Sequence, residues 1–222
     1  MDWSALSLSF QLGAATTLVL LPVGLWLGRV LALRTFPGKG FVEALVALPL
    51  LLPPTVIGFY LLVAFGGQSP LGRMFQSVVG HTLAFSFEGL LLASVLVNIP
   101  FVVQPIQRAF EAIAPEIREA AACCGMSPSV AFRRIELPLA WPGITTGLVL
   151  AFAHTIGEFG VVLMVGGSIP GETRTMAIAI YDRVQAFDQR AAGIMATTLL
   201  IVAVLALGIT NTLARRIGRR HG

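Results

Sequence analysis

Charged residues are scarce in this chain of 222 residues: they make up 12% of it, about half the roughly 25% typical of a soluble domain. Hydrophobic residues make up 56%, and too few polar side chains remain to cover a soluble core of that composition. A disordered chain, a nucleic-acid-binding domain and a soluble enzyme are therefore excluded. The composition predicts a polytopic membrane protein, with a lipid bilayer and not nucleic acid as its surroundings.

Residues that carry chemistry are scarce as well. The two cysteines, Cys123 and Cys124, are adjacent, and neighbouring cysteines pair only in a strained ring, so no disulfide framework is expected. Three histidines and dispersed carboxylates suggest neither a metal site nor a nucleophilic triad. The sequence also lacks the Gly-x-x-x-x-Gly-Lys-Ser/Thr phosphate loop. We therefore expect no cofactor bound by this chain, and any ATP that it uses must be hydrolysed by another subunit.

Long charge-free runs predict five membrane-spanning helices. Each run reaches or nears the roughly 20 residues that cross about 30 Å of hydrocarbon. Backbone groups in lipid must bond within their own segment, so helices and not strands are expected. The runs are Trp3–Gly28, Ala44–Gly72, Gly89–Gln107, Leu137–Gly157 and Ala191–Ala214. A shorter and more polar element around Leu71–Phe85 would make a sixth. The predicted fold is an all-α transmembrane bundle in a single domain over residues 1–222.

The basic residues predict the orientation of the bundle. With the amino terminus outside and the carboxyl terminus inside, eleven of the fifteen Lys and Arg residues fall inside, as the positive-inside bias requires. The inside groups are Arg29, Arg34 and Lys39; Arg108, Arg118, Arg133 and Arg134; and Arg215, Arg216, Arg219 and Arg220. The outside residues are Arg73, Arg174, Arg183 and Arg190.

The loop between the third and fourth spans, residues 108–138, is predicted to be cytoplasmic and helical. Proline in a first turn and glycine after a last turn bound helices. Those signals are Pro115 and Gly125 for a helix over Glu116–Cys124, and Ser127 and Pro128 for a second helix through about Ile135. The small residues Ala120-Ala121-Ala122 would let another protein approach the first helix closely. From the residues alone, a solvated helix–turn–helix and a docking element are equally good interpretations.

Short sequence motifs at fixed spacing in this loop resemble the EAA loop of ABC-importer permeases. They are Glu119-Ala120-Ala121, Gly125, Ile135 and Leu137-Pro138. The resemblance implies a coupling helix that sits in a cleft on a cytoplasmic ATPase subunit. Glu119, Ala120 and Gly125 would lie at the contact, and Ala121 is part of the same Glu-Ala-Ala motif. It also implies that Ile135, Leu137 and Pro138 set the geometry of the following span.

Further sequence motifs are similar to those of the molybdate-type permeases of that family. They are Leu48-Pro49-Leu50-Leu51-Leu52-Pro53-Pro54-Thr55-Val56-Ile57-Gly58, Gly157-Glu158-Phe159-Gly160, Ile169-Pro170-Gly171 and Thr173-Arg174-Thr175. This resemblance implies an inner-membrane permease for an oxyanion, most simply molybdate, with tungstate or sulfate as alternatives. It further implies a pair of permeases, two ATPase subunits and a soluble oxyanion-binding protein on the outer side.

Glu158 is unusual for a membrane segment. If the fourth helix begins near Pro142, Glu158 lies about 16 residues into it, about 24 Å along the axis, and His154 lies on the same face. Two interpretations stay open: a gate or pathway lining shared with Asn98 and Gly157, or a buried pair that locks helices together. A carboxylate facing the path would repel an oxyanion, which favours the second interpretation. A small intramembrane enzyme is the rival from another class, and its catalytic pair would have to be His154 and Glu158.

The segment Glu172–Arg190 alternates polar and apolar residues and is predicted to lie at the outer surface. Its three arginines, Arg174, Arg183 and Arg190, are candidates for contact with the binding protein. A solvated surface helix is an equally good interpretation of the same pattern.

Overall fold

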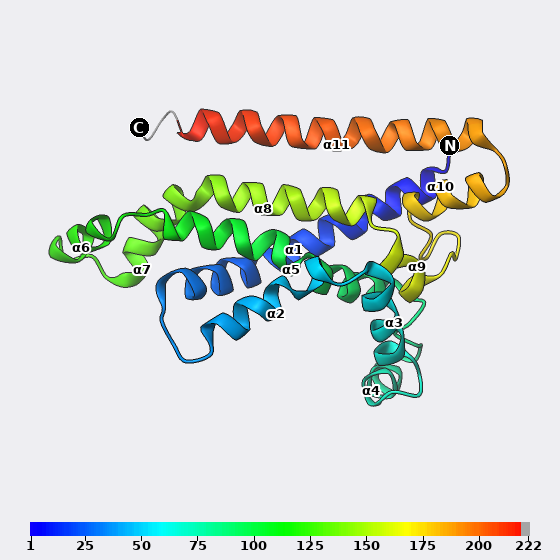
Figure 1. The fold of residues 1–222 in the computed structure, drawn as a ribbon, viewed down its shortest axis with the longest axis horizontal. Helices are drawn as coiled ribbons and strands as arrows, with labels where there is room; N and C mark the ends of the chain where they lie inside the picture. Colours follow the sequence, from blue (N-terminus) through cyan, green and yellow to red (C-terminus); the bar gives the residue numbers. More distant parts are fainter. Residues whose placement is uncertain (219–222) are drawn as a thin grey trace.

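The computed structural model describes the backbone of residues 1–218 and the side chains of residues 1–205 and 208. The side chains of Arg215 and Arg216, and the whole of Arg219 and Arg220, lie outside the described residues. Every regular element in the described range is a helix (Figure 1). The four longest are α1 (Trp3–Leu33), α5 (Phe87–Glu111), α8 (Leu137–Gly157) and α11 (Gln189–Gly218). The shorter ones are α2 (Lys39–Leu51), α3 (Pro54–Phe65), α4 (Pro70–Val79), α6 (Pro115–Cys123), α7 (Pro128–Ala131), the π-helical turn η1 (Phe132–Glu136), α9 (Gly160–Gly166) and α10 (Met176–Gln185). The all-α prediction is confirmed.

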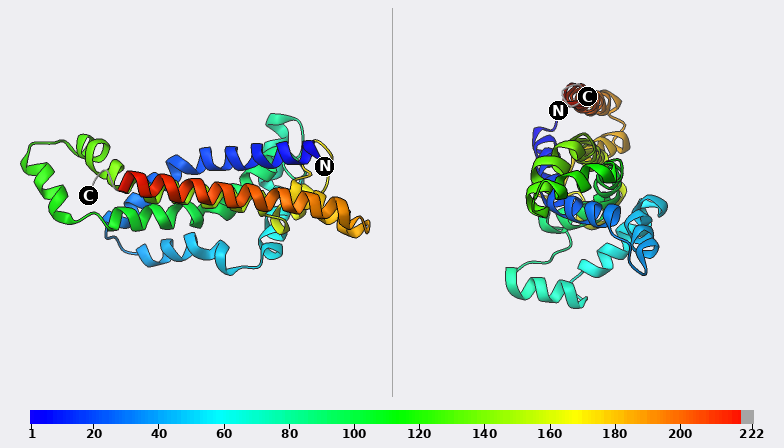
Figure 2. Two further views of the ribbon diagram at one scale, coloured as in Figure 1. Left: turned by 90° about the horizontal axis from the view of Figure 1, so that it is seen from above. Right: turned by 90° about the vertical axis from the view of Figure 1, so that its left-hand side faces the viewer.

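The centre of the fold is a bundle of α1, α5 and α8, with α11 lying along α8 (Figures 1 and 2). Its largest buried cluster includes Leu20, Ile106, Phe110 and Ile144, which come from all three helices. Both α1 and α5 begin at capped positions, where Asp2 accepts a hydrogen bond from Ala5 N and Ser86 accepts one from Gly89 N. These caps fix where the central helices start.

Glycines let the central helices approach closely. A Cβ at Gly24 or Gly28 of α1 would lie within 3 Å of Val102 or Ile106 of α5. On the other side of α5, Gly143 of α8 faces Pro105 in the same way. Small residues are what helices in lipid use for such contacts, because hydrophobic exclusion from water does not drive the helices together there.

The second predicted span, Ala44–Gly72, is not one continuous helix. The segment forms two helices, α2 and α3, bent by 108° at a short break. The cause is local, because Pro53 forces Leu52 out of the helical region (ψ 141°) and Pro54 then starts the next helix at its first turn. Hydrophobicity runs through the break unchanged, which is why composition alone does not reveal it.

The sixth element is shorter than predicted, whereas the fourth helix has the bounds of its charge-free run. The shorter sixth element around Leu71–Phe85 is the ten-residue helix α4, about 15 Å long at 1.5 Å per residue and too short to cross a membrane. The fourth charge-free run, Leu137–Gly157, coincides with α8, and only the alternative of a later start near Pro142 is wrong, because Pro142 lies inside the helix. It ends at Gly157, although the sequence stays apolar beyond.

By length and apolar composition, three helical segments of the described chain could cross a membrane, and the bent pair α2–α3 would be a fourth. The three are Trp3–Leu33, Phe87–Glu111 and the continuous segment Pro128–Gly157. The fifth predicted span falls within α11, of which Gln189–Leu205 is a shorter apolar stretch. The start of α1 lies at the end of the molecule opposite α6 and α7 (Figure 1). Five spans, with the amino terminus outside and the carboxyl terminus inside, stay a prediction.

Candidate functional site

The loop at residues 108–138 projects from one end of the bundle as two short helices (Figure 1). Its first helix, α6, begins with Pro115 and is followed by Gly125, whose φ of 73° lies in the left-handed region. There Gly125 N–H donates to the Ala122 carbonyl and Met126 N–H to the Ala121 carbonyl, which satisfies the last carbonyls of the helix. The prediction of two helices is confirmed, although the second one is α-helical only over Pro128–Ala131 and continues as the π-turn η1.

The residues of the EAA motif differ in exposure and lie on two different faces of this loop. Glu119, Ala120 and Gly125 are exposed and form no ion pair or side-chain hydrogen bond among the described residues. Ala121 is buried against the rest of the loop. Ile135, Leu137 and Pro138 are half-buried where the loop enters α8. The exposed set is therefore available to a partner, whereas Leu137 packs against the largest buried cluster of the bundle.

An ion-pair cluster around a buried carboxylate, at the same end of the bundle, is not apparent from the sequence. The Glu136 carboxylate is 5% exposed and accepts hydrogen bonds from Arg29 Nε at 2.7 Å and Arg118 Nε at 3.1 Å. From the sequence alone, these two arginines serve only to predict the orientation of the bundle, and Glu136 belongs to none of the motifs. No local signal could join Arg29 to Glu136, because 107 positions separate them.

A polar cluster lies inside the bundle between α5 and α8. Asn98 is fully buried, donates to the Ser94 carbonyl at 2.8 Å and Thr155 Oγ1 at 3.0 Å, and lies 3.2 Å from His154 Nδ1 through its Oδ1. The His154 ring stacks on Phe101 of α5, with 4.2 Å between ring centroids. Asn98 and His154, two pathway candidates on separate predicted spans, are thus brought together.

Glu158 is part of this cluster but also shapes the backbone. Its Oε2 lies 3.8 Å from His154 Nε2, as the predicted pairing requires. Its Oε1 accepts a hydrogen bond of 2.9 Å from Val161 N–H in the first turn of α9. Glu158 therefore holds the junction at which α8 ends and α9 begins. Gly157, the last residue of α8, has nothing within 4 Å of where a Cβ would be.

The segment Glu172–Arg190 contains helix α10 and the first residues of α11, and its three arginines differ in their surroundings. Arg174 lies 3.5 Å from Asp182 and donates to Ser168 Oγ at 3.0 Å, and Arg183 lies 3.7 Å from Asp188. Arg190 is exposed and forms no ion pair among the described residues. Only the last of the three predicted contact residues therefore carries a charge that no described neighbour offsets.

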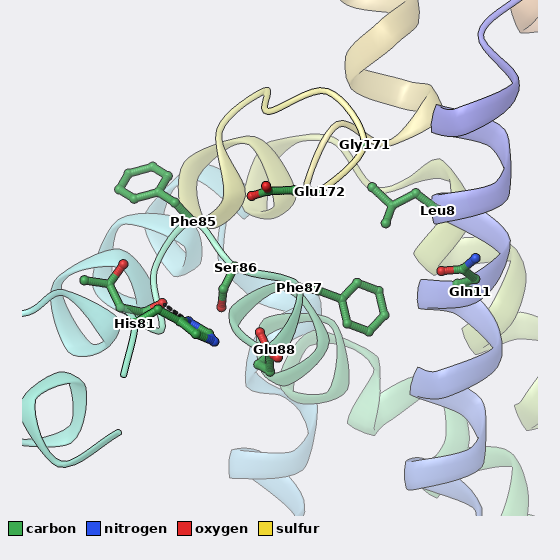
Figure 3. A pocket seen from close by; sticks show the side chains of 10 residues that line it. Leu8, Gln11, His81, Phe85, Ser86, Phe87, Glu88, Gly171 and Glu172 are labelled. Atoms are coloured by element: carbon green, nitrogen blue, oxygen red, sulfur yellow. Dashed lines mark hydrogen bonds between the residues drawn. The ribbon is translucent and has the colours of Figure 1, made fainter. Parts of the chain in front are cut away.

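A pocket of about 450 Å³ opens near the start of α1 (Figure 3). It lies between α1, the loop before α5 and the turn after α9, and the side chains of His81, Glu88 and Glu172 line it. Two carboxylates at its wall make the pocket unsuitable for an anion, although it lies close to the first turn of α5. No sequence pattern indicates this pocket, because its lining comes from three separate segments.

Comparison with known proteins is consistent with these features. The family model described as "Binding-protein-dependent transport system inner membrane component" matches residues 21–220. The molybdenum transport system permease protein ModB of Azotobacter vinelandii is 46% identical over 206 residues, 93% of this chain and 91% of that protein. Its counterpart in Escherichia coli K12 is 36% identical over 100% of this chain and 97% of that protein. The sulfate transport system permease protein CysT of Salmonella typhimurium is 34% identical over 89% of this chain and 71% of that protein.

Two solved structures have the same fold. A bacterial ABC transporter that imports the acidic polysaccharide alginate matches with a TM-score of 0.77 at 18% identity, over 96% of this chain and 79% of that one. The methionine ABC transporter MetNI in an inward-facing conformation matches with a TM-score of 0.71 at 17% identity, over 97% and 94%. The bent α2–α3 pair and the helical loop thus belong to a fold that is found in ABC transporters.

Proposed function

The chain belongs to the family of inner-membrane components of binding-protein-dependent transport systems, and from this premise we propose that it forms, with a second copy of itself, the membrane pathway of an ATP-driven molybdate importer. Membership makes it a multi-pass inner-membrane permease and not an enzyme. The observation that carries the substrate is the full-length similarity to permeases of molybdenum transport systems. The sulfate permease relative keeps sulfate as the second candidate.

ATP is hydrolysed by a separate cytoplasmic subunit in this proposal, and α6 is the element that meets it. Exposure supports this role, because Glu119 and Ala120 of α6 and Gly125 just beyond it are exposed, and the Glu119 carboxylate forms no ion pair among the described residues. Two ATPase subunits would each take one α6 from a pair of permeases. The pairing itself is supported by the small number of spans, too few to enclose a pathway in a single copy.

The polar cluster of Asn98, His154 and Glu158 holds helices together in this proposal. Asn98 is fully buried and its amide is bonded on both sides, and Glu158 accepts a hydrogen bond from Val161 N–H in the first turn of α9. Groups engaged in this way leave few hydrogen-bonding positions for an ion in transit. A pathway role for Gly157 is retained, because open space adjoins it.

The soluble binding protein is proposed to dock on α10 and the residues that follow it. Beside the free charge of Arg190, the exposed apolar side chains of Tyr181, Val184 and Phe187 lie on this segment, and Phe187 is 89% exposed. Apolar anchors within a charged rim are typical of protein–protein contacts. Arg174 and Arg183, which are paired with aspartates, support the shape of this surface.

Uptake measurements test the substrate. Cells that lack only this chain should lose uptake of radiolabelled molybdate and regain it with the wild-type gene, with tungstate and sulfate measured in parallel. Unimpaired molybdate uptake together with lost sulfate uptake would transfer the assignment to sulfate. Co-purification of an ATPase subunit with the tagged chain tests the transporter class, and transport by the chain alone in liposomes would contradict it.

A further inference from the structure

We infer that Arg118 and Glu136 are positioning residues that carry the movement of α6 to the three central helices. This inference rests on the proposed function, because it concerns how an ATPase bound at α6 would move the membrane pathway. It is supported by the hydrogen bonds of these two side chains, neither of which belongs to the EAA motif.

Arg118 is the side-chain link between α6 and the bundle. Its Nη1 and Nη2 donate to the carbonyls of Ile113 and Phe110 at 3.0 and 2.7 Å, and its Nε donates to Glu136 Oε1 at 3.1 Å. Phe110 lies in the last turn of α5, and Ile113 lies in the short connection between α5 and α6. Within the described residues, no other side chain of α6 forms a hydrogen bond to another element.

Glu136 extends the link to α8 and α1. It is the last residue of η1, directly before α8, and its second oxygen accepts from Arg29 Nε on α1 at 2.7 Å. The Arg29 guanidinium also lies over the Phe132 ring of η1, 5.1 Å from the ring centroid. Arg118 and Glu136 together thus connect α6 with the end of α5, with α1 and with the start of α8.

The link is suited to moving as a unit. Charge-assisted hydrogen bonds are the stronger kind, and a carboxylate as buried as Glu136 is costly to leave without its partners. The remainder of α6 is largely exposed, apart from Ala121. When a partner displaces α6, Arg118 therefore pulls on the end of α5 and on the start of α8 together.

The test uses the complete importer, with its ATPase subunits and binding protein, in liposomes. The variants are Arg118→Lys, which keeps the charge but lacks the planar fork, and Glu136→Gln, which keeps the shape. We expect both to assemble and to hydrolyse ATP, while molybdate imported per ATP falls about tenfold. The double variant should be no worse than either single one, since both break one link. Lys39→Gln is the matched control, because Lys39 forms an ion pair with Glu43, 3.8 Å away, that has no link to α6.

Each outcome separates the inference from the proposed function. If the wild-type complex imports no oxyanion, the proposed function fails and the comparison of variants does not arise. If the wild type imports but the variants keep a normal ratio of import to ATP hydrolysis, the inference is overturned. It is overturned as well if the variants only lower the yield of complex, with a normal ratio in what is recovered, because that result assigns the link to folding alone.

Discussion

Replacing Gly143 with alanine should separate α8 from α5. The added Cβ would lie 2.7 Å from the Pro105 carbonyl oxygen and closer still to Ala109 Cβ. Carbon contacts are optimal at about 3.5–4.0 Å, so the helices must part by about 1 Å. The obstacle is largely backbone, which no rotamer change removes. Overpacking of this kind costs about 1–3 kcal/mol, and alanine recovers about 1 kcal/mol of helix propensity.

The net loss expected is about 2 kcal/mol, taking the upper end of the overpacking range. For a chain of this size that corresponds to a Tm lower by about 4–8 °C, measured by thermal aggregation of the purified protein in detergent. Gly193→Ala is the matched control, because Gly193 is also helical and has nothing within 4 Å of an added Cβ. It should leave Tm unchanged or raise it slightly. Equal Tm values for the two variants would refute the close contact between α5 and α8.

Two further substitutions test the loop and the polar cluster. Gly125→Ala forces a side chain into a φ of 73° at a cost of about 1–2 kcal/mol, so less ATPase should co-purify with this variant. Ala122→Gly is the control and should have a smaller effect. Equal recovery of the ATPase with both variants would contradict the requirement for a left-handed residue at position 125. Glu158→Gln keeps an acceptor for Val161 N–H and should retain most oxyanion uptake. Glu158→Ala loses this hydrogen bond, worth about 1 kcal/mol, and should reduce the amount of assembled protein. Lost uptake by a fully assembled Glu158→Gln complex would instead make Glu158 a pathway residue.

Local signals in the sequence predict most of the helices, because each signal acts on its own neighbours. Pro115 and Gly125 bound α6 with little displacement from expectation, and the charge-free runs fall on helices. The failure at the second run is also local: Pro53-Pro54 breaks the helix, but a hydrophobicity window gives proline little weight. The direction of the 108° bend could not be predicted at all, since it depends on packing against other helices.

The candidate site is only partly predictable for a different reason. The EAA motif identifies the exposed Glu119, Ala120 and Gly125 of the loop, together with four residues that are buried or half-buried. The ion pairs of Glu136 depend on the fold, because Arg29 and Arg118 approach it from α1 and α6 only once the bundle forms. Counting arginines by side of the membrane treats these two as interchangeable charges, although each has a fixed partner.

The orientation of the bundle can be tested with the two native cysteines. Cys123 and Cys124 are exposed at the end of α6, and they are the only cysteines of the chain. If the loop is cytoplasmic, a membrane-impermeant maleimide should label inverted vesicles and leave right-side-out vesicles unlabelled. A variant with both cysteines replaced by serine and Phe187→Cys on the opposite side should show the reverse pattern, since Phe187 is 89% exposed.

The same reagent then tests docking at α6. Labelling of Cys123 and Cys124 in inverted vesicles should fall when the ATPase subunit is co-expressed, because the partner would cover the helix that carries them. Phe187→Cys should label equally with and without the ATPase in right-side-out vesicles, which controls for changes in the amount of protein. Labelling of the native cysteines from the outer side would reverse the predicted orientation. If the ATPase co-purifies but labelling of the native cysteines does not fall, the contact lies somewhere other than the end of α6.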